Sequence, residues 1–239
     1  MMMDAYDAML GGVILAAPQN VNACPVVPAP DIFVETHRQK TKIRHDLSKE
    51  QLMAMQGDTD LPYQMASVVH LETGGMMHGD IKVGYDIVMD EIPLAAADPV
   101  FDSCVRYRQV RVTLELDPTI FIAGDFAPDS CWYYEINQHE ESHIDMDQIV
   151  IDKYAARIKD GLGLAFSLPQ DNVSGPVNKT AVPALKKDMG QTVMAMVDVM
   201  VRDMGRERQQ KQQGVDSLHG YAYIMDQCYD GDNVIRVDP

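Results

Sequence analysis

The sequence predicts an α+β protein, in which a small antiparallel sheet packs on one helix and a second long helix lies behind it. Three patterns support this fold class. Apolar and polar residues alternate strictly near the end of 105–116, which is typical of a half-buried strand. Residues 132–161 have the composition of a helix. Apolar residues recur every three or four positions over 185–204, which indicates a second, amphipathic helix.

The N-terminal part is expected to precede the folded domain. Residues 1–23 contain the apolar stretch LGGVILAA and end in Val-Asn-Ala, although their first residues are acidic rather than basic, and we expect a cleaved export signal there. Residues 24–60 form an N-terminal extension, with a proline-rich leader and then a short helix at 47–55. The folded domain is assigned to 61–230, and an acidic tail to 231–239.

Strands are expected in the first half of the folded domain. Two of them, at 65–73 and 81–89, are separated by glycine-rich turn sequences. The strand at 105–116 follows, and Asp117-Pro118 predicts a turn before a further short strand at 119–123. These segments predict the antiparallel sheet.

The first long helix is predicted from its capping residues. Asp129 and Ser130 supply N-cap chemistry before 132–161, and Gly161 and Gly163 are expected to end the helix. Residues 165–183 have the composition of a loop, with prolines and glycine distributed along them.

The second long helix begins near Pro183 and ends at Gly214. Several of the chain's 17 methionines lie along it. Thioether side chains can bind copper, but these methionines lie on an amphipathic helix, so we expect adaptable core packing instead.

Composition excludes some classes of function. The chain has 36 acidic and 20 basic residues, giving a formal charge of -16, which disfavours binding to nucleic acids or to anionic membrane surfaces. No uninterrupted apolar run approaches the length of a transmembrane span. We therefore expect no nucleic-acid partner and no transmembrane span.

The four cysteines are Cys24, Cys104, Cys131 and Cys228, and none forms a Cys-x-x-Cys pair. In an exported chain they allow two disulfides, of which Cys104 with Cys131 is the favoured one. Together with the expected signal, this predicts a periplasmic or secreted protein. Four buried free thiols in a cytosolic protein are the alternative.

The segment His139-Glu140-Glu141-Ser142-His143 is the main candidate for a functional site. It is an H-E-x-x-H motif inside the first predicted long helix. Residues four apart lie on one helical face, so both imidazoles can reach the same point, where a zinc ion would suit two neutral histidines. Glu140 can reach water at the open position of the metal and act as general base.

A catalytic zinc ion needs a third protein ligand, and spacing alone leaves several candidates. Asp147 suits a hydrogen-bonding or capping role better than ligation, because it lies two turns along the helix from His139. The second helix offers Asp188, Asp198 and Asp203. His219 follows that helix in the sequence Ser-Leu-His-Gly-Tyr.

A resemblance to a known family bears on the choice of the third ligand. The stretch from Cys131-Trp132 through the motif to Ala155-Ala156-Arg157, followed by Ser217-Leu218-His219-Gly220, resembles a bacterial family of predicted secreted zinc-dependent proteases over roughly residues 64–225. That family pairs H-E-x-x-H with Thr-x-His-Gly and an aspartate before it, where this chain has Ser217 and Asp216. The resemblance implies zinc ligation by His139, His143 and His219, with Glu140 as the base.

These observations predict a zinc-dependent hydrolase, a peptidase that acts on peptide or protein substrates. Tyr221 or Tyr223 could stabilise the oxyanion, although buried structural tyrosines are the usual alternative. The strand at 105–116 or the one at 119–123 could bind an extended peptide by strand addition. Two other classes stay open: an envelope protein that binds metal without hydrolysis, and a structural domain without metal.

Overall fold

The computed structural model describes residues 23–55, 74–94, 102–216, 227–230 and 234–235. The strands are β1 (Asp31–Arg38), β2 (Lys42–Leu47), β3 (Gly75–Pro93), β4 (Ser103–Ala123) and β5 (Val173–Val177), with β6 (Tyr229–Asp230) and β7 (Val234–Ile235) as a separate pair. The helices are α1 (Lys49–Met55), α3 (Cys131–Ala165) and α4 (Val182–Val215), with short 3-10 helices at Pro169–Asn172 and Lys179–Ala181.

β4 is the central strand of a five-stranded mixed sheet. β3 pairs with it antiparallel along its full length and so occupies one edge. β5, β1 and β2 follow one another along the other edge, where β5 is antiparallel and the other two are parallel to β4. The α+β class is confirmed, but the prediction of a small antiparallel sheet is wrong, because β1 and β2 add parallel pairs from the charged N-terminal segment.

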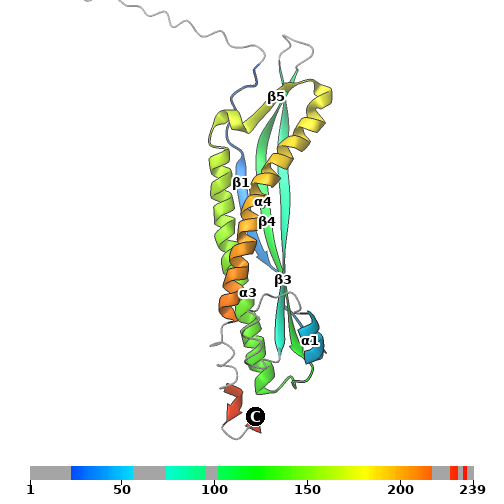
Figure 1. Cartoon of the computed structure of the whole chain (residues 1–239). Coiled ribbons are helices and arrows are strands. Elements are labelled where there is room, and N and C mark those ends of the chain that lie inside the picture. Colours follow the sequence, from blue (N-terminus) through cyan, green and yellow to red (C-terminus); the bar gives the residue numbers. More distant parts are fainter. Residues whose placement is uncertain (1–22, 56–73, 95–101, 217–226, 231–233, 236–239) are drawn as a thin grey trace, which may run out of the picture.

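α3 and α4 run antiparallel along one face of this sheet (Figure 1). With 35 and 34 residues, each helix is about 50 Å long. The predicted alternation in β4 is confirmed, since its apolar side chains face the helices and are buried. The main core residues are Val110, Val112, Leu114, Leu116, Ile120 and Ile122 of β4, Ile144, Ile151 and Ile158 of α3, and Val193, Val197 and Met204 of α4.

The predicted turn at Asp117-Pro118 is wrong, because β4 continues through it to Ala123. Proline is normally excluded from a central strand, since it lacks a backbone N–H. Pro118 lies in the gap between two ladders on that side of β4. β1 pairs with β4 as far as Leu116, and β2 pairs with it from Thr119 onward. The missing donor therefore removes no bond from either of these ladders.

The predicted helices are confirmed, and one predicted end is wrong. Ser130 caps α3 by accepting a hydrogen bond from the Tyr133 N–H at 3.2 Å. The helix does not end at Gly161, however, but continues to Ala165. A Cβ at Gly161 would lie 3.3 Å from the Met200 side chain, so glycine allows α4 to pack closely there. The predicted strand at 65–73 lies outside the described residues.

Two disulfides form, and neither is the predicted one: Cys24 bonds to Cys104, and Cys131 to Cys228. Cys104 and Cys131 cannot meet, because β4 carries the chain about 60 Å away from Cys104 before α3 begins. Two disulfides indicate an oxidising compartment outside the cytoplasm. Among the helices that the structure describes, none has an apolar stretch sufficient to cross a bilayer.

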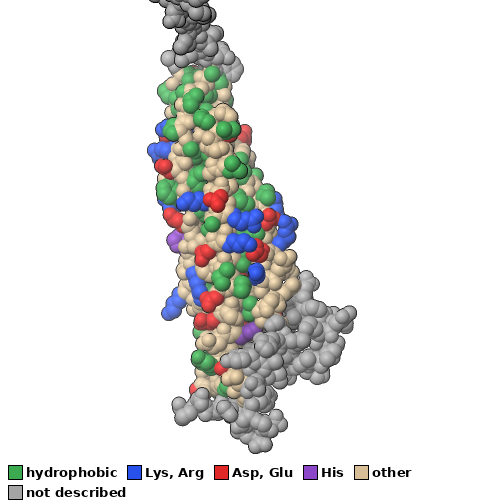
Figure 2. Space-filling view, turned by 90° about the vertical axis from the view of Figure 1, so that its left-hand side faces the viewer, with side chains coloured by type: hydrophobic (Ala, Val, Ile, Leu, Met, Phe, Trp, Pro, Cys, Tyr) green, Lys and Arg blue, Asp and Glu red, His purple; other side chains and the backbone are tan. Residues whose placement is uncertain are grey.

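Charges of both signs lie side by side across the middle of one long face of the molecule (Figure 2). Ion pairs on its surface include Arg38 with Asp145, which joins β1 to α3, and Lys153 with Glu207, which joins α3 to α4. Exposed pairs of this kind contribute little to stability, because water and salt screen them. The buried core, rather than these pairs, therefore holds the helices on the sheet.

Candidate metal centre

The two histidines of the motif converge as predicted. His139 and His143 lie one turn apart on α3, and their Nε2 atoms are 3.2 Å from each other. The two rings are nearly perpendicular, and both side chains are largely buried. Helical spacing thus brings two nitrogen donors to one point.

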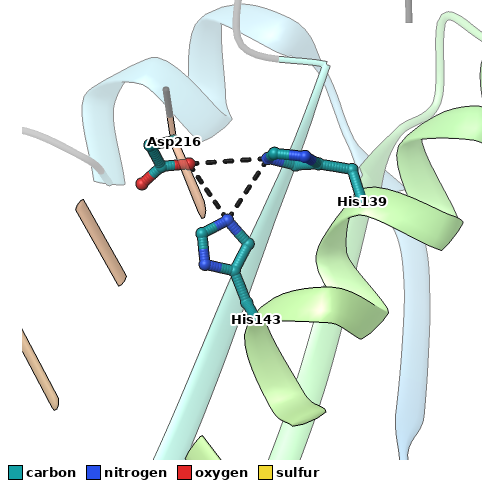
Figure 3. A group of neighbouring side chains, drawn as sticks. All are labelled: His139, His143 and Asp216. Atoms are coloured by element: carbon teal, nitrogen blue, oxygen red, sulfur yellow. Dashed lines mark hydrogen bonds and ion pairs between the residues drawn. The ribbon is translucent and has the colours of Figure 1, made fainter. Parts of the chain in front are cut away.

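Asp216 completes a group of three ligand atoms (Figure 3). It is the C-cap residue of α4, and its Oδ1 lies 3.0 Å from His143 Nε2 and 3.5 Å from His139 Nε2. A tetrahedral ion with bonds of about 2.05 Å holds its ligands about 3.3 Å apart. The three separations fit such an ion, so these residues are a candidate metal centre of two histidines and one aspartate.

The other aspartates considered as ligands have different partners. Asp147 is fully buried, and Arg208 donates two hydrogen bonds to its carboxylate, at 2.7 and 2.8 Å. Asp198 accepts a hydrogen bond from the Tyr85 hydroxyl, and Asp203 pairs with an arginine of its own helix. In the described part of the chain, none of them joins the candidate metal centre.

Two predicted site residues, His219 and Tyr221, lie outside the described residues. Their roles as third ligand and as oxyanion donor therefore stay predictions. Among the described residues, Asp216 is the third candidate ligand, and it lies three positions before His219 in the chain.

Glu140, the predicted base, lies between α3 and the beginning of β3. Its side chain is buried, with the residue 6% exposed, and the Met77 N–H donates a hydrogen bond to its carboxylate. Gly75 makes room for it, because a Cβ there would lie 2.9 Å from Glu140 Oε1. The buried carboxyl group therefore lies within electrostatic reach of both histidines.

Burial raises the pKa of Glu140 to about 7, although the neighbouring His143 and His139 act to lower it. Carboxyl groups with a pKa near neutrality can both accept and release a proton at physiological pH. In the metal-free protein Glu140 can therefore exchange a proton near neutral pH.

The candidate metal centre favours a bound positive charge, which can be a proton or a metal ion. Burial lowers the pKa of His143, but its hydrogen bond and charge interaction with Asp216 reverse this and raise it overall. Burial also acts to raise the pKa of Asp216, yet the two histidines hold it well below its usual range. Because a metal ion must displace protons from its ligands, metal and protons compete for this position.

The raised pKa of Glu140 predicts how the metal-free protein responds to pH. The folded state holds this proton up to about pH 7, whereas an unfolded glutamate releases it near 4.5. The folded state therefore binds more protons between these values, and its free energy of unfolding falls as pH rises through them. Glu140→Gln mimics the neutral carboxyl group, so at pH 8 the variant should be more stable than the wild type by about 3 kcal/mol.

Urea denaturation in the presence of chelator, at pH 4 and pH 8, measures this difference. Glu141→Gln is the matched control, since Glu141 is the next residue and is only half-buried. We expect the gap between Glu140→Gln and the wild type to appear only at the higher pH. An equal gap at both pH values would contradict the assignment of a buried, titrating Glu140.

A scan against protein-family models and searches of curated proteins and of solved structures found no match for this chain. The fold and the site define an α+β protein with a candidate metal centre of two histidines and one aspartate beside a buried glutamate. The resemblance to secreted zinc-dependent proteases thus has no family match behind it.

Proposed function

We propose that the protein is a zinc-dependent hydrolase that cleaves peptide bonds, with Glu140 as general base. The observation that supports this most is that Glu140, a buried carboxyl group, immediately follows a ligand residue in the chain and adjoins a group of three ligand atoms spaced for one ion. A structural zinc site has no need of such a group.

His139, His143 and Asp216 would hold the ion. A bound zinc ion supplies a Lewis acid for the scissile carbonyl and lowers the pKa of water at its open position. Glu140 accepts the proton of that water and then donates it to the leaving amine. Three protein ligands are the usual number for a catalytic zinc ion, since the fourth position is left for water or substrate.

Two imidazoles and a carboxylate are also the ligand set of non-haem iron sites. Glu140 favours hydrolysis over that chemistry, because it is a buried carboxyl group that immediately follows a ligand, where it can serve as a general base. We therefore propose zinc as the resident metal.

The proposed substrate is a peptide or protein outside the cytoplasm. The predicted docking strands, 105–116 and 119–123, are both parts of β4, which is paired on both edges and has no free edge there. β3 is the edge strand whose first residues adjoin Glu140, so we propose it as the strand along which an extended peptide binds.

Elemental analysis of protein purified without chelator, combined with cleavage of a broad peptide library, tests the proposed function. We expect about one zinc ion per chain, and cleavage that chelation abolishes and added zinc restores. Bound zinc without cleavage of any peptide would instead support a metal-binding protein that is not an enzyme. A chain that neither retains nor takes up zinc would contradict the proposal entirely.

A further inference from the structure

We propose that Gln212 is a positioning residue of the metal centre, which fixes the His143 ring so that its Nε2 lone pair faces the metal. This inference rests on the proposed function, since it concerns the same centre. The inference is supported by a set of contacts between α3 and α4 that neither the motif nor its spacing predicts.

Polar residues of the two helices meet in three successive layers. Along α4 they are Arg208, Gln212 and Asp216, each one turn after the last, and along α3 they are Asp147, His143 and His139, in the reverse direction. Arg208 pairs with Asp147, Gln212 contacts His143, and Asp216 contacts both histidines. The layer of Gln212 therefore lies directly behind the ligand atoms.

The Gln212 amide bridges two residues of α3. Its Nε2 donates to the backbone oxygen of His143 at 3.0 Å and to Asp147 Oδ1, and its Oε1 contacts His143 Nδ1. The Asp147 carboxylate can only accept while it is ionised, so it requires the NH₂ group of the amide on its own side. This contact sets the orientation of the amide, and it places the amide oxygen against His143 Nδ1.

An amide oxygen can only accept a hydrogen bond, so His143 Nδ1 must carry the hydrogen. In the neutral ring, Nε2 then has the free lone pair, and Nε2 is the atom that faces His139 and Asp216. Partners of this kind, which bind the second nitrogen of a metal-ligating histidine, fix its tautomer and its orientation.

Asp147 is itself held firmly. Arg208 binds both of its carboxylate oxygens and also donates to the backbone oxygen of Gly79 at 2.8 Å. A Cβ at Gly79 would lie only 2.8 Å from Asp147 Oδ2, so β3 closes over this pair. The chain of contacts from β3 through Arg208 and Asp147 to Gln212 leaves the amide one orientation.

The experiment compares Gln212→Leu with Gln213→Leu, which makes the same change at the neighbouring exposed position of α4. Zinc affinity is measured by competition with a chelator of known affinity. Nitrogen-15 NMR of the zinc-loaded protein shows which ring nitrogen of His143 binds the ion and which carries hydrogen. We expect Gln212→Leu to lower zinc affinity by about 10- to 100-fold. We also expect it to speed the exchange of the His143 Nδ1 hydrogen with water, because that hydrogen loses its acceptor.

The wild-type NMR result is informative even where a variant fails to fold. Zinc bound to Nδ1 of His143 in the wild type would overturn the inference, as would unchanged zinc affinity and unchanged Nδ1–H exchange in folded Gln212→Leu. Failure of the wild type to bind zinc would instead refute the proposed function.

Discussion

Replacing Glu140 with glutamine is expected to lower the rate of peptide hydrolysis by about 10²- to 10⁴-fold and to leave the zinc content unchanged. Glutamine preserves the volume of the side chain but cannot accept the proton of the attacking water. Glu140 is not among the three ligand atoms, so the centre itself stays complete. The measurement is the turnover of a cleaved library peptide at pH 7–8, with zinc content determined on the same samples.

Two controls separate a chemical effect from a structural one. Glu141→Gln removes the same charge from the adjacent position and should retain activity. The metal-free Glu140→Gln protein should be the more stable fold at pH 8, so its inactivity cannot be ascribed to unfolding. A zinc-loaded Glu140→Gln protein with full activity would exclude Glu140 as the base and, with it, the proposed mechanism.

The motif was predictable because its geometry is local. Four residues of helix suffice to align His139 and His143, and the helix itself is predicted from its N-cap Ser130 and its composition. The burial of Glu140 is different, since it depends on the first residues of β3, including Gly75, which are more than 60 residues away in the chain. Its altered pKa could therefore not be inferred from the motif alone.

Asp216 could have been predicted as a ligand from the packing of the two helices, which arguments from residue spacing did not consider. Two consecutive long helices of similar length commonly pack antiparallel, and in that arrangement the last turn of the second lies near the first turns of the first. His139 lies two turns into α3, and Asp216 is the last residue of α4. This pairing favours Asp216 over Asp188 and Asp198, which lie near the start and the middle of the same helix.

The strands β1 and β2 and the disulfides were not predictable in the same way. β1 and β2 lack the clear alternation that marks a strand, because the apolar residues Phe33 and Ile43 lie at exposed positions in them. The pairing of cysteines depends on where distant elements end, and the 21-residue length of β4 decides it. Sequence patterns report local periodicity and leave such distances undetermined.

Asp216→Ala is expected to lower zinc affinity by more than about 100-fold, beyond the range for residues that only support a ligand. The reason is that it removes one of the three atoms around the ion, 3.0 and 3.5 Å from the histidine nitrogens. Asp203→Ala is the matched control, since Asp203 lies on the same helix and pairs only with Arg206 on the surface in the described contacts. Chelator competition measures both affinities, and equal affinities would remove Asp216 from the centre.

The same measurement on His219→Ala decides what kind of centre this is. A loss confined to Asp216→Ala leaves three protein ligands and an open position, as catalysis requires. A loss confined to His219→Ala would make His219 the third ligand and reduce Asp216 to a hydrogen-bonding partner of the histidines. Equal, large losses in both variants would mean four protein ligands, and because closed tetrahedral sites are structural, that result would count against hydrolysis even with zinc firmly bound.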